Sequence, residues 1–349
     1  MLPTYACLDC GSPLSKTRGM GRVIVVGAGV VGLSCAIRLL EGGHRVDVVA
    51  RDLPLESTSA VAAAIWYPYR ALPQDLVTTW GKASYAAFEV LAQQPDTGVS
   101  VVLGTEVFRS RVPDPWWRGA VPSLDRETAL PPGCVDGWTF ATPLIEMPTY
   151  LPWLSGRVAA LGGTITRLSM CELPAGADLV VNASGIGSRR LAGDPSVVPV
   201  RGQVVRVDQI GLERWWLEGA GLTYVVPRSR DIVVGGTDIE GEGEWSRTPD
   251  PVVAEEIMAR AVALVPELAG ARVLGHKVGL RPARPSVRLE RVGDVIHCYG
   301  HGGAGVTLSW GCADAVRDLA EGTGWRGGVN DPSAQPVERG GQLLAAPPK

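Results

Sequence analysis

Short apolar runs alternate with glycine-rich turns and amphipathic stretches along this chain. The β-branched run that begins at residue 23 predicts a strand over 23–27, and apolar residues at helical spacing predict a helix over 30–41. A second apolar run predicts a strand over 45–50. Continuous apolar strands are typical of a parallel sheet that is covered on both faces. The fold is therefore predicted to begin with a βαβ unit.

The remaining pattern predicts a mixture of helices and strands. Residues 59–65 are expected to start a helix or an extended crossover, and 99–140 have strand character with many prolines and tryptophans. The other predicted helices are 76–95, 143–161, 251–265 and 305–321, and the other predicted strands are 178–182, 204–207, 224–227, 232–234, 280–289 and 295–299.

These elements predict an α/β fold in which a Rossmann-like nucleotide domain is interleaved with a mostly β substrate domain. The nucleotide domain is assigned residues 21–70, 142–200 and 278–325, and the substrate domain is assigned 71–141 and 201–277. Residues 1–20 are expected to be a disordered extension and 326–349 a disordered tail, the latter because it is rich in Gly, Pro and Gln. Interleaving argues against a simple NAD dehydrogenase, whose nucleotide domain is usually continuous.

Composition narrows the class of protein. With 349 residues, 46% hydrophobic and 20% charged, the chain can bury a core large enough for two domains. A net charge of −3 with mixed signs gives no reason to expect nucleic acid or an anionic membrane as a partner. No apolar run approaches the roughly 20 residues of a membrane helix. The expected class is a cytoplasmic enzyme.

The cysteines and histidines predict no metal site. The seven cysteines are an odd number, widely scattered, so free thiols are expected. Cys7 and Cys10 form a CxxC pair, but no second ligand pair accompanies it to complete a zinc site. The four histidines show no ligand spacing, and His301 is interpreted as a structural residue.

A glycine turn joins the first predicted strand to the first helix. In Gly27-Ala28-Gly29-Val30-Val31-Gly32, the first glycine permits the tight turn, the second lets the backbone approach phosphates, and the third allows helix and strand to pack closely. An anion would bind the free N–H groups at the start of the helix. Because strand, turn and helix follow in order, this motif predicts a site for FAD or NAD(P).

A second glycine-rich turn, residues 299–307, also follows a buried strand and opens a helix. Two such turns far apart in sequence suit a cofactor with two ends. The first would hold the pyrophosphate, and the second would hold an isoalloxazine ring whose edge gains negative charge on reduction. Residues 279–291 lie just before this turn and are dense in arginine. They are either a solvated strand face or, through Arg281, a bidentate partner for a substrate carboxylate.

Several of these segments together resemble the D-amino-acid oxidases, in unbroken order from about residue 21 to residue 322. The segments that carry the resemblance are 26–34, 62–68, 224–227, 279–282 with 288–290, and 299–303 with 310–311. The resemblance implies FAD as the cofactor and a fold of the D-amino-acid oxidase and glutathione reductase type. It also implies a small-molecule D-amino acid and molecular oxygen as partners, with a homodimer as an option.

The resemblance implies roles for three catalytic residues. Arg281 would pair with the substrate carboxylate, Tyr224 would donate its hydroxyl to the same group, and the carbonyl of Gly303 would accept from the amino group. Hydride transfer to flavin N5 would follow without a dedicated side-chain base, giving a 2-oxo acid, ammonia and hydrogen peroxide. The implied cofactor contacts are Gly27 to Gly32, Arg51, Asp52, Ser57, Thr58, Ser59, Ala63, Ala64, Ile65, Ser184, Arg281, Gly302, Gly303, Gly305, Val306 and Thr307.

Four positions refine the expected substrate and cofactor contacts. Asp52 follows Arg51 at the strand end, displaced from the usual acidic position, and is still assigned to the ribose. Ala220 stands where some members carry a lid tyrosine, so a more open entrance is expected. Asp238 replaces the arginine that D-aspartate oxidases would need, and an anion there would repel acidic substrates. With Tyr67 lining the pocket, neutral or basic D-amino acids are the predicted substrates.

Three other functions stay open at this stage. A D-aspartate or glycine/sarcosine-type oxidase would share cofactor and chemistry, and a substrate panel separates them. An NAD(P) dehydrogenase would bind an exchanging cofactor and would not be yellow. A non-catalytic flavin or ligand-binding protein would be yellow yet unbleached by any amino acid.

Overall fold

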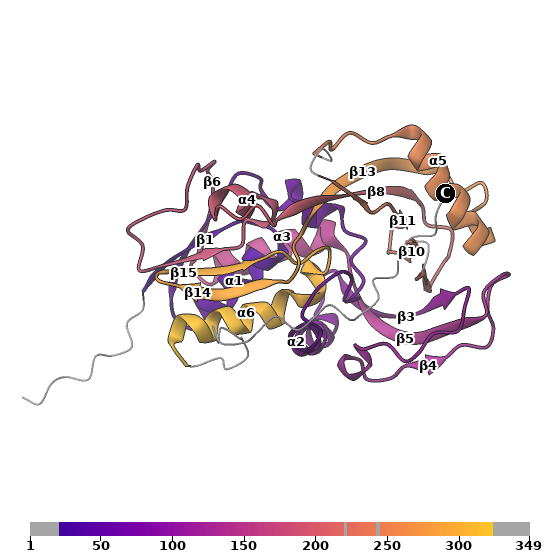
Figure 1. Cartoon of the computed structure of the whole chain (residues 1–349), viewed down its shortest axis with the longest axis horizontal. Coiled ribbons are helices and arrows are strands. Elements are labelled where there is room, and N and C mark those ends of the chain that lie inside the picture. The colour runs from indigo at the N-terminus through magenta and orange to yellow at the C-terminus, as the bar shows by residue number, and fades with distance from the viewer. Residues whose placement is uncertain (1–20, 220–221, 242–244, 324–349) are drawn as a thin grey trace, which may run out of the picture.

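Two β-sheets with their covering helices make up the molecule (Figure 1). The computed structural model of the chain describes residues 21–219, 222–241 and 245–323. The predicted extension over 1–20 with its CxxC pair, the position of Ala220 and the predicted tail over 326–349 lie outside the described residues.

The first sheet is six-stranded, and all its neighbouring strands are parallel except for one antiparallel edge strand. Its interior strands are almost wholly apolar because helices pack on both faces. The strand order is β14 (Arg288–Val292), β15 (Val295–Tyr299), β7 (Leu179–Asn182), β1 (Arg22–Val26), β2 (Arg45–Ala50) and β6 (Thr164–Arg167). The helices are α1 (Val30–Glu41), α2 (Gln74–Ala92), α3 (Met147–Ala160), α4 (Ser188–Leu191) and α6 (Gly305–Glu321), with α6 running along the lower side of the sheet in Figure 1.

The second sheet is nine-stranded and mostly antiparallel, with helix α5 (Pro251–Leu264) packed on it through a second apolar core. Its order is β12 (Ile239–Glu240), β8 (Val198–Asp208), β11 (Asp231–Gly235), β10 (Thr223–Pro227), β9 (Trp215–Glu218), β3 (Val99–Phe108), β5 (Asp136–Ile145) and β4 (Asp125–Arg126), and β13 (Val273–Ala283) pairs with β8. The long β8 and β13 extend from this sheet toward the first one, as Figure 1 shows, so they carry residues into the space between the sheets.

Some predicted boundaries are wrong. The predicted strand over 280–289 is the end of β13 followed by a bend and β14, because the pairing of β13 with β8 ends at Ala283 and Pro285 lies in the bend. The helix predicted from 143 begins at Met147, since residues 143–145 complete β5. Residues Thr58–Val61 form a 3-10 helix, and the chain then runs without regular structure to the bridge at Ile65, with Ala64 at a φ of 61°. Strand β6, which is mostly exposed, has no apolar pattern and was not predicted.

Candidate active site

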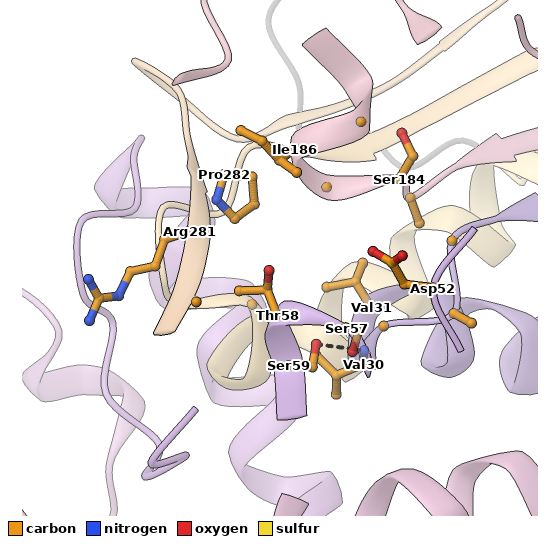
Figure 2. Close-up of a pocket in the computed structure, with 18 of the residues that line it drawn as sticks. Val30, Val31, Asp52, Ser57, Thr58, Ser59, Ser184, Ile186, Arg281 and Pro282 are labelled. Atoms are coloured by element: carbon orange, nitrogen blue, oxygen red, sulfur yellow. Dashed lines mark hydrogen bonds between the residues drawn. The ribbon is translucent and has the colours of Figure 1, made fainter. Parts of the chain in front are cut away.

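A cavity of about 680 Å³ lies where the carboxyl ends of β1, β2 and β7 approach β8, β10 and β13. That volume is in the range of sites for small molecules and cofactors. In Figure 2, Asp52 and Ser184 lie at one end of the group of lining residues and Arg281 at the other. The predicted site residues that line it are Gly27, Ala28, Gly29, Val30, Val31, Arg51, Asp52, Ser57, Thr58, Ser59, Ser184, Tyr224, Arg281, Gly303, Gly305 and Val306.

The first glycine turn has the backbone that an anion site needs. A Cβ atom at Gly32 would lie 1.9 Å from the carbonyl oxygen of Gly27, so only glycine lets α1 start this close to β1. Helix α1 has no side-chain cap at Gly29 and no acidic residue in its first turn. The N–H of Val30 donates to Ser59 Oγ at 3.1 Å (Figure 2). The positive end of this helix is therefore available to a phosphate group.

The second glycine turn brings another helix N-terminus to the same cavity. Helix α6 also lacks a side-chain cap and a first-turn acid, and its first residues, Gly305 and Val306, line the cavity. The N–H of Gly302 donates to the carbonyl of Pro282 at 3.0 Å. This bond ties the turn to the strand that carries Arg281. Two open helix ends on one cavity fit a cofactor that has a pyrophosphate and a second electron-accepting group.

Arg281 and Tyr224 lie together at the far end of the cavity. Arg281 Nη1 donates to the carbonyl of Thr237 at 2.8 Å, which fixes the side chain while the guanidinium retains further donors. The ring of Tyr224 crosses Gly235, where a Cβ atom would lie 2.0 Å from its Cζ. Burial raises the pKa of the Tyr224 hydroxyl, and the nearby Arg281 cation lowers it by less. The hydroxyl is thus a neutral hydrogen-bond donor at neutral pH.

The other predicted site residues do not line the cavity: Gly32, Ala63, Ala64, Ile65, Tyr67, Asp238, Gly302 and Thr307. Two of them are joined side by side, because Thr307 Oγ1 donates to the carbonyl of Tyr67 at 2.8 Å and accepts from its N–H at 3.0 Å. The Tyr67 hydroxyl donates to Glu106 at 2.7 Å. Ile65 forms a β-bridge with Leu144.

Asp238 has a cationic partner that the sequence did not reveal. Arg70 Nη1 donates to Asp238 Oδ2 at 2.7 Å, and the side chain of Asp238 is only 15% exposed. Arg70 also pairs with Glu240. The carboxylate of Asp238 is therefore held within a network of opposite charges instead of standing alone beside the substrate end of the cavity.

Asp52 lies at the carboxyl end of β2, at the opposite end of the cavity. Arg51 Nη2 contacts Asp52 Oδ2 at 2.6 Å, and Arg247 Nη2 lies 3.8 Å from the same atom. The hydrogen bond from Arg51 is the main cause that lowers the pKa of Asp52, so the group is an anion that can accept hydrogen bonds. The role of Asp52 in binding ribose hydroxyls stays a prediction, and Arg51 already donates to both of its carboxylate oxygens.

Several residues that line the cavity were not predicted from the sequence. Ser184 in the turn after β7 was predicted, and its neighbours in Ala183-Ser184-Gly185 could have been predicted with it, since they follow a buried strand in the same way as the first glycine turn. The residues after β6 had no such signal because that strand was not predicted. The residues that were missed are Val26, Ala50, Val61, Ala62, Leu168, Ser169, Met170, Ala183, Gly185, Ile186, Gly187, Arg189, Arg190, Leu191, Gly202, Val204, Trp245, Arg247, Gly279, Pro282, Cys298 and His301.

The interleaved fold, the two open helix ends and the arginine at the far end of the cavity define a flavin-dependent oxidoreductase. A family model described as FAD dependent oxidoreductase matches residues 22–319, and the chain belongs to that family. FAD is accordingly its cofactor. Among the described residues, no helix combines the length and hydrophobicity that a membrane crossing requires.

Three curated relatives align over most of the chain. It is 52% identical over 319 residues to a D-amino-acid oxidase from Rubrobacter xylanophilus, covering 87% of this chain and 97% of the relative. It is 44% identical to a D-amino-acid oxidase from Streptomyces coelicolor, covering 86% and 97%. It is also 38% identical to a human D-aspartate oxidase, covering 86% and 95%.

A solved structure confirms the predicted fold class. Glycine oxidase from Geobacillus kaustophilus superposes with a TM-score of 0.73, at 20% identity and over 86% of this chain and 95% of that one. At that identity the likeness concerns the fold alone.

Proposed function

We propose that this chain is a D-amino-acid oxidase that uses FAD to deaminate neutral or basic D-amino acids, producing a 2-oxo acid, ammonia and hydrogen peroxide. The observation that carries this proposal is the position of Arg281 and Tyr224. They are two carboxylate-binding groups at one end of a cavity whose other parts suit a dinucleotide. The 52% and 44% identical relatives named D-amino-acid oxidase support the same reaction.

The substrate carboxylate would bind the guanidinium of Arg281, with the hydroxyl of Tyr224 as a second donor. The bond from Arg281 to the carbonyl of Thr237 holds the guanidinium before a substrate arrives. Less conformational freedom is then lost on binding, and the charge-assisted pair fixes the α-carbon relative to the cavity. The carbonyl of Gly303, on the turn beside Arg281, would accept from the amino group.

The N–H groups at the start of α1 and the side chains of Ser57, Thr58, Ser59 and Asp52 would hold the adenine dinucleotide part of FAD. Gly303, Gly305 and Val306, which line the cavity, would hold the ring, and Gly302, Thr307 and backbone groups of 63–65 are proposed as further contacts although they do not line it. When bound there, FAD supplies the oxidant that takes a hydride from the α-carbon and passes electrons to oxygen. The role of the protein is to align one enantiomer of the substrate and to keep it aligned.

D-Aspartate is the alternative substrate that an observation favours, since a human D-aspartate oxidase is 38% identical. The Arg70–Asp238 pair bears on this choice because it lies one residue from Thr237, which holds Arg281. As long as Asp238 neutralises Arg70, the pair offers no free cation to a second carboxylate. Neutral or basic side chains therefore remain the proposed substrate class.

The test is anaerobic mixing of the purified yellow protein with a panel of D- and L-amino acids while the flavin absorption band is followed. Bleaching by D-Val or D-Ala but not by their L-forms is the expected result. Bleaching by D-Asp alone would favour the alternative, and no bleaching by any member would reject the oxidase. Arg281→Ala should keep its flavin and lose several kcal/mol in kcat/KM, since a bidentate charge pair is lost. A change below about tenfold would remove Arg281 from its proposed role.

The domain division, the homodimer and the cytoplasmic location are parts of the same proposal. The FAD domain is proposed to consist of 21–70, 142–200 and 278–325, and the substrate domain of 71–141 and 201–277. Light scattering of the purified protein tests the dimer, and cell fractionation tests the location.

A further inference from the structure

Three thiols and one imidazole lie together under the nucleotide cavity. Cys35 comes from the buried face of α1, Cys298 from β15 and Cys312 from α6, while His301 stands in the turn between the last two elements. Their exposed fractions are 0% for Cys35, 1% for Cys298, 0% for Cys312 and 4% for His301. The proposed reaction uses none of these four side chains.

The geometry of this cluster is close to that of a metal site. One potential ligand atom from each of Cys298, His301 and Cys312 lies within 4.8 Å of the other two. Around a tetrahedral zinc ion with Zn–S bonds of about 2.3 Å, two sulfurs lie about 3.8 Å apart. The three side chains therefore need to move by only about 1 Å to share one ion. Cys35 of α1 is a hydrogen-bond neighbour of Cys298 but is not within 4.8 Å of all three ligand atoms, so it would have to move further than they do to supply a fourth donor.

Two further features point to a cation at this position. The Nε2 atom of His301 is buried and has no hydrogen-bond partner among the described residues, an arrangement that is costly unless a ligand satisfies it. The Cys298 thiol also has both Cys312 and Cys35 within hydrogen-bond distance, so three sulfurs lie side by side in a buried space. Sulfur donors gathered in this way are the ligands that soft and borderline cations prefer.

We propose that Cys298, His301 and Cys312, with Cys35 as a fourth ligand, form a binding site for one d¹⁰ cation of the soft to borderline class, Zn²⁺ or Cu⁺. Thiolate and imidazole donors in a closed, dry pocket select such ions over Mg²⁺ or Ca²⁺, which prefer oxygen. Each cysteine that binds gives up its thiol proton to solvent as its bond to the metal forms. No electron transfer is involved, because both ions keep their oxidation state.

A bound ion would stabilise the structure, because its ligands come from three elements around the cofactor cavity. Its ligands connect α1, β15 and α6, and His301 stands in the same turn as Gly303. Cys298 and His301 also line the nucleotide cavity. A bound ion would therefore fix the turn between β15 and α6, and would raise the melting temperature of the holoenzyme.

The test is to measure the metal content of the FAD-loaded enzyme, purified without a metal-affinity tag. The enzyme is incubated with Zn²⁺, or anaerobically with Cu⁺, and passed over a desalting column, and the metal is measured by mass spectrometry. One equivalent per chain of either ion is expected, and the two arms identify which is preferred. Cys298→Ser and Cys312→Ser should each weaken binding about tenfold or more. Cys171→Ser is the matched control, because Cys171 is an exposed cysteine outside the cluster.

X-ray absorption on the wild-type enzyme keeps the proposal testable if a variant fails to fold. Two or three sulfurs at about 2.3 Å and one nitrogen at about 2.0 Å from the metal are expected. The proposal fails if the shell contains only oxygen and nitrogen, or if neither ion binds in stoichiometric amount. It also fails if Cys298→Ser binds as tightly as Cys171→Ser, or if Cys298 and Cys312 prove to be disulfide-bonded in the purified enzyme.

Discussion

The guanidinium of Arg281 lies directly against the backbone of Gly202. A methyl group at position 202 would stand 2.5 Å from Cζ, Nη1 and Nη2 of Arg281, well inside van der Waals contact. The pairing of β8 with β13 produces this approach, since Gly279 stands opposite Gly202 and Arg281 is two residues further along β13. The proposed carboxylate clamp thus depends on the absence of a side chain on the neighbouring strand.

Gly202→Ala is therefore expected to displace the Arg281 guanidinium without removing it. A misplacement of about 1 Å at a substrate-positioning group costs about a hundredfold in rate, so kcat/KM for D-Val should fall by about that factor, mainly through KM. Gly156→Ala is the matched control, because Gly156 is an exposed helical glycine with open space around it. Steady-state oxygen consumption measures both. Kinetic constants within about twofold of wild type in Gly202→Ala would contradict this role for the glycine.

The elements around the two glycine turns could be predicted from the sequence because they are local. Strand, glycine turn and helix are consecutive, so the predicted bounds of α1 and α6 agree with the structure and the turn residues Gly27 and Gly29 line the cavity. The position of Arg281 at the cavity does not follow from a local pattern in the same way, because β14 and β15 lie between its strand and the second glycine turn, and a hydrogen bond from Gly302 to Pro282 brings the two together.

The substrate half depends on contacts between distant segments, which a single sequence does not encode in any local pattern. Gly202 matters only because β8 pairs with β13, and a lone glycine in a strand gives no sign of its partner. The charge of Asp238 was interpreted without Arg70, a residue 168 positions away. The cysteine cluster was missed for the same reason, because its members come from three elements and have no ligand spacing along the chain.

Tyr224→Phe should weaken the binding of the substrate carboxylate. A hydrogen bond to a charged group contributes about 1.5–3 kcal/mol, so kcat/KM should fall by about tenfold or more while the flavin spectrum stays unchanged. Tyr85→Phe is a suitable control: its hydroxyl donates to the carbonyl of Ala141 at 3.0 Å, a contact made within the core. That variant should lose stability and keep its KM. Equal KM values for Tyr224→Phe and wild type would remove the hydroxyl from substrate binding.

Asp238→Asn should shift specificity toward acidic substrates. Removing this carboxylate leaves Arg70 paired only with Glu240, which is 50% exposed, and adds one positive charge beside the substrate end of the cavity. The ratio of kcat/KM for D-Asp to that for D-Val is expected to rise about tenfold, or about 1.4 kcal/mol. Glu240→Gln makes the same change in net charge at the more exposed partner and should shift the ratio less. If both variants keep the wild-type ratio, the Arg70–Asp238 pair does not set specificity.

Glu106, in the nine-stranded sheet, makes the stability of the protein depend on pH. Its side chain is buried on β3, where burial raises its pKa to about 7 and the hydrogen bond from the Tyr67 hydroxyl lowers it by less. Below the usual glutamate pKa the carboxyl is protonated in both the folded and the unfolded chain, so its titration does not change the free energy of unfolding there. Between that value and 7 the unfolded chain loses its proton first, so the free energy of unfolding falls as the pH rises.

Glu106→Gln should abolish this part of the pH dependence, since an amide keeps the hydrogen bond from Tyr67 and cannot ionise. A pKa of about 7 in place of 4.5 makes the folded state about 3 kcal/mol less stable at pH 8 than at pH 4, and the variant should recover that amount. Melting temperatures of both proteins across this range measure the effect, with the exposed Glu255→Gln as control. Parallel curves for wild type and Glu106→Gln would show that the buried carboxyl is not the titrating group. A curve that flattens only in Glu106→Gln would assign the loss of stability at high pH to the burial of this one acid.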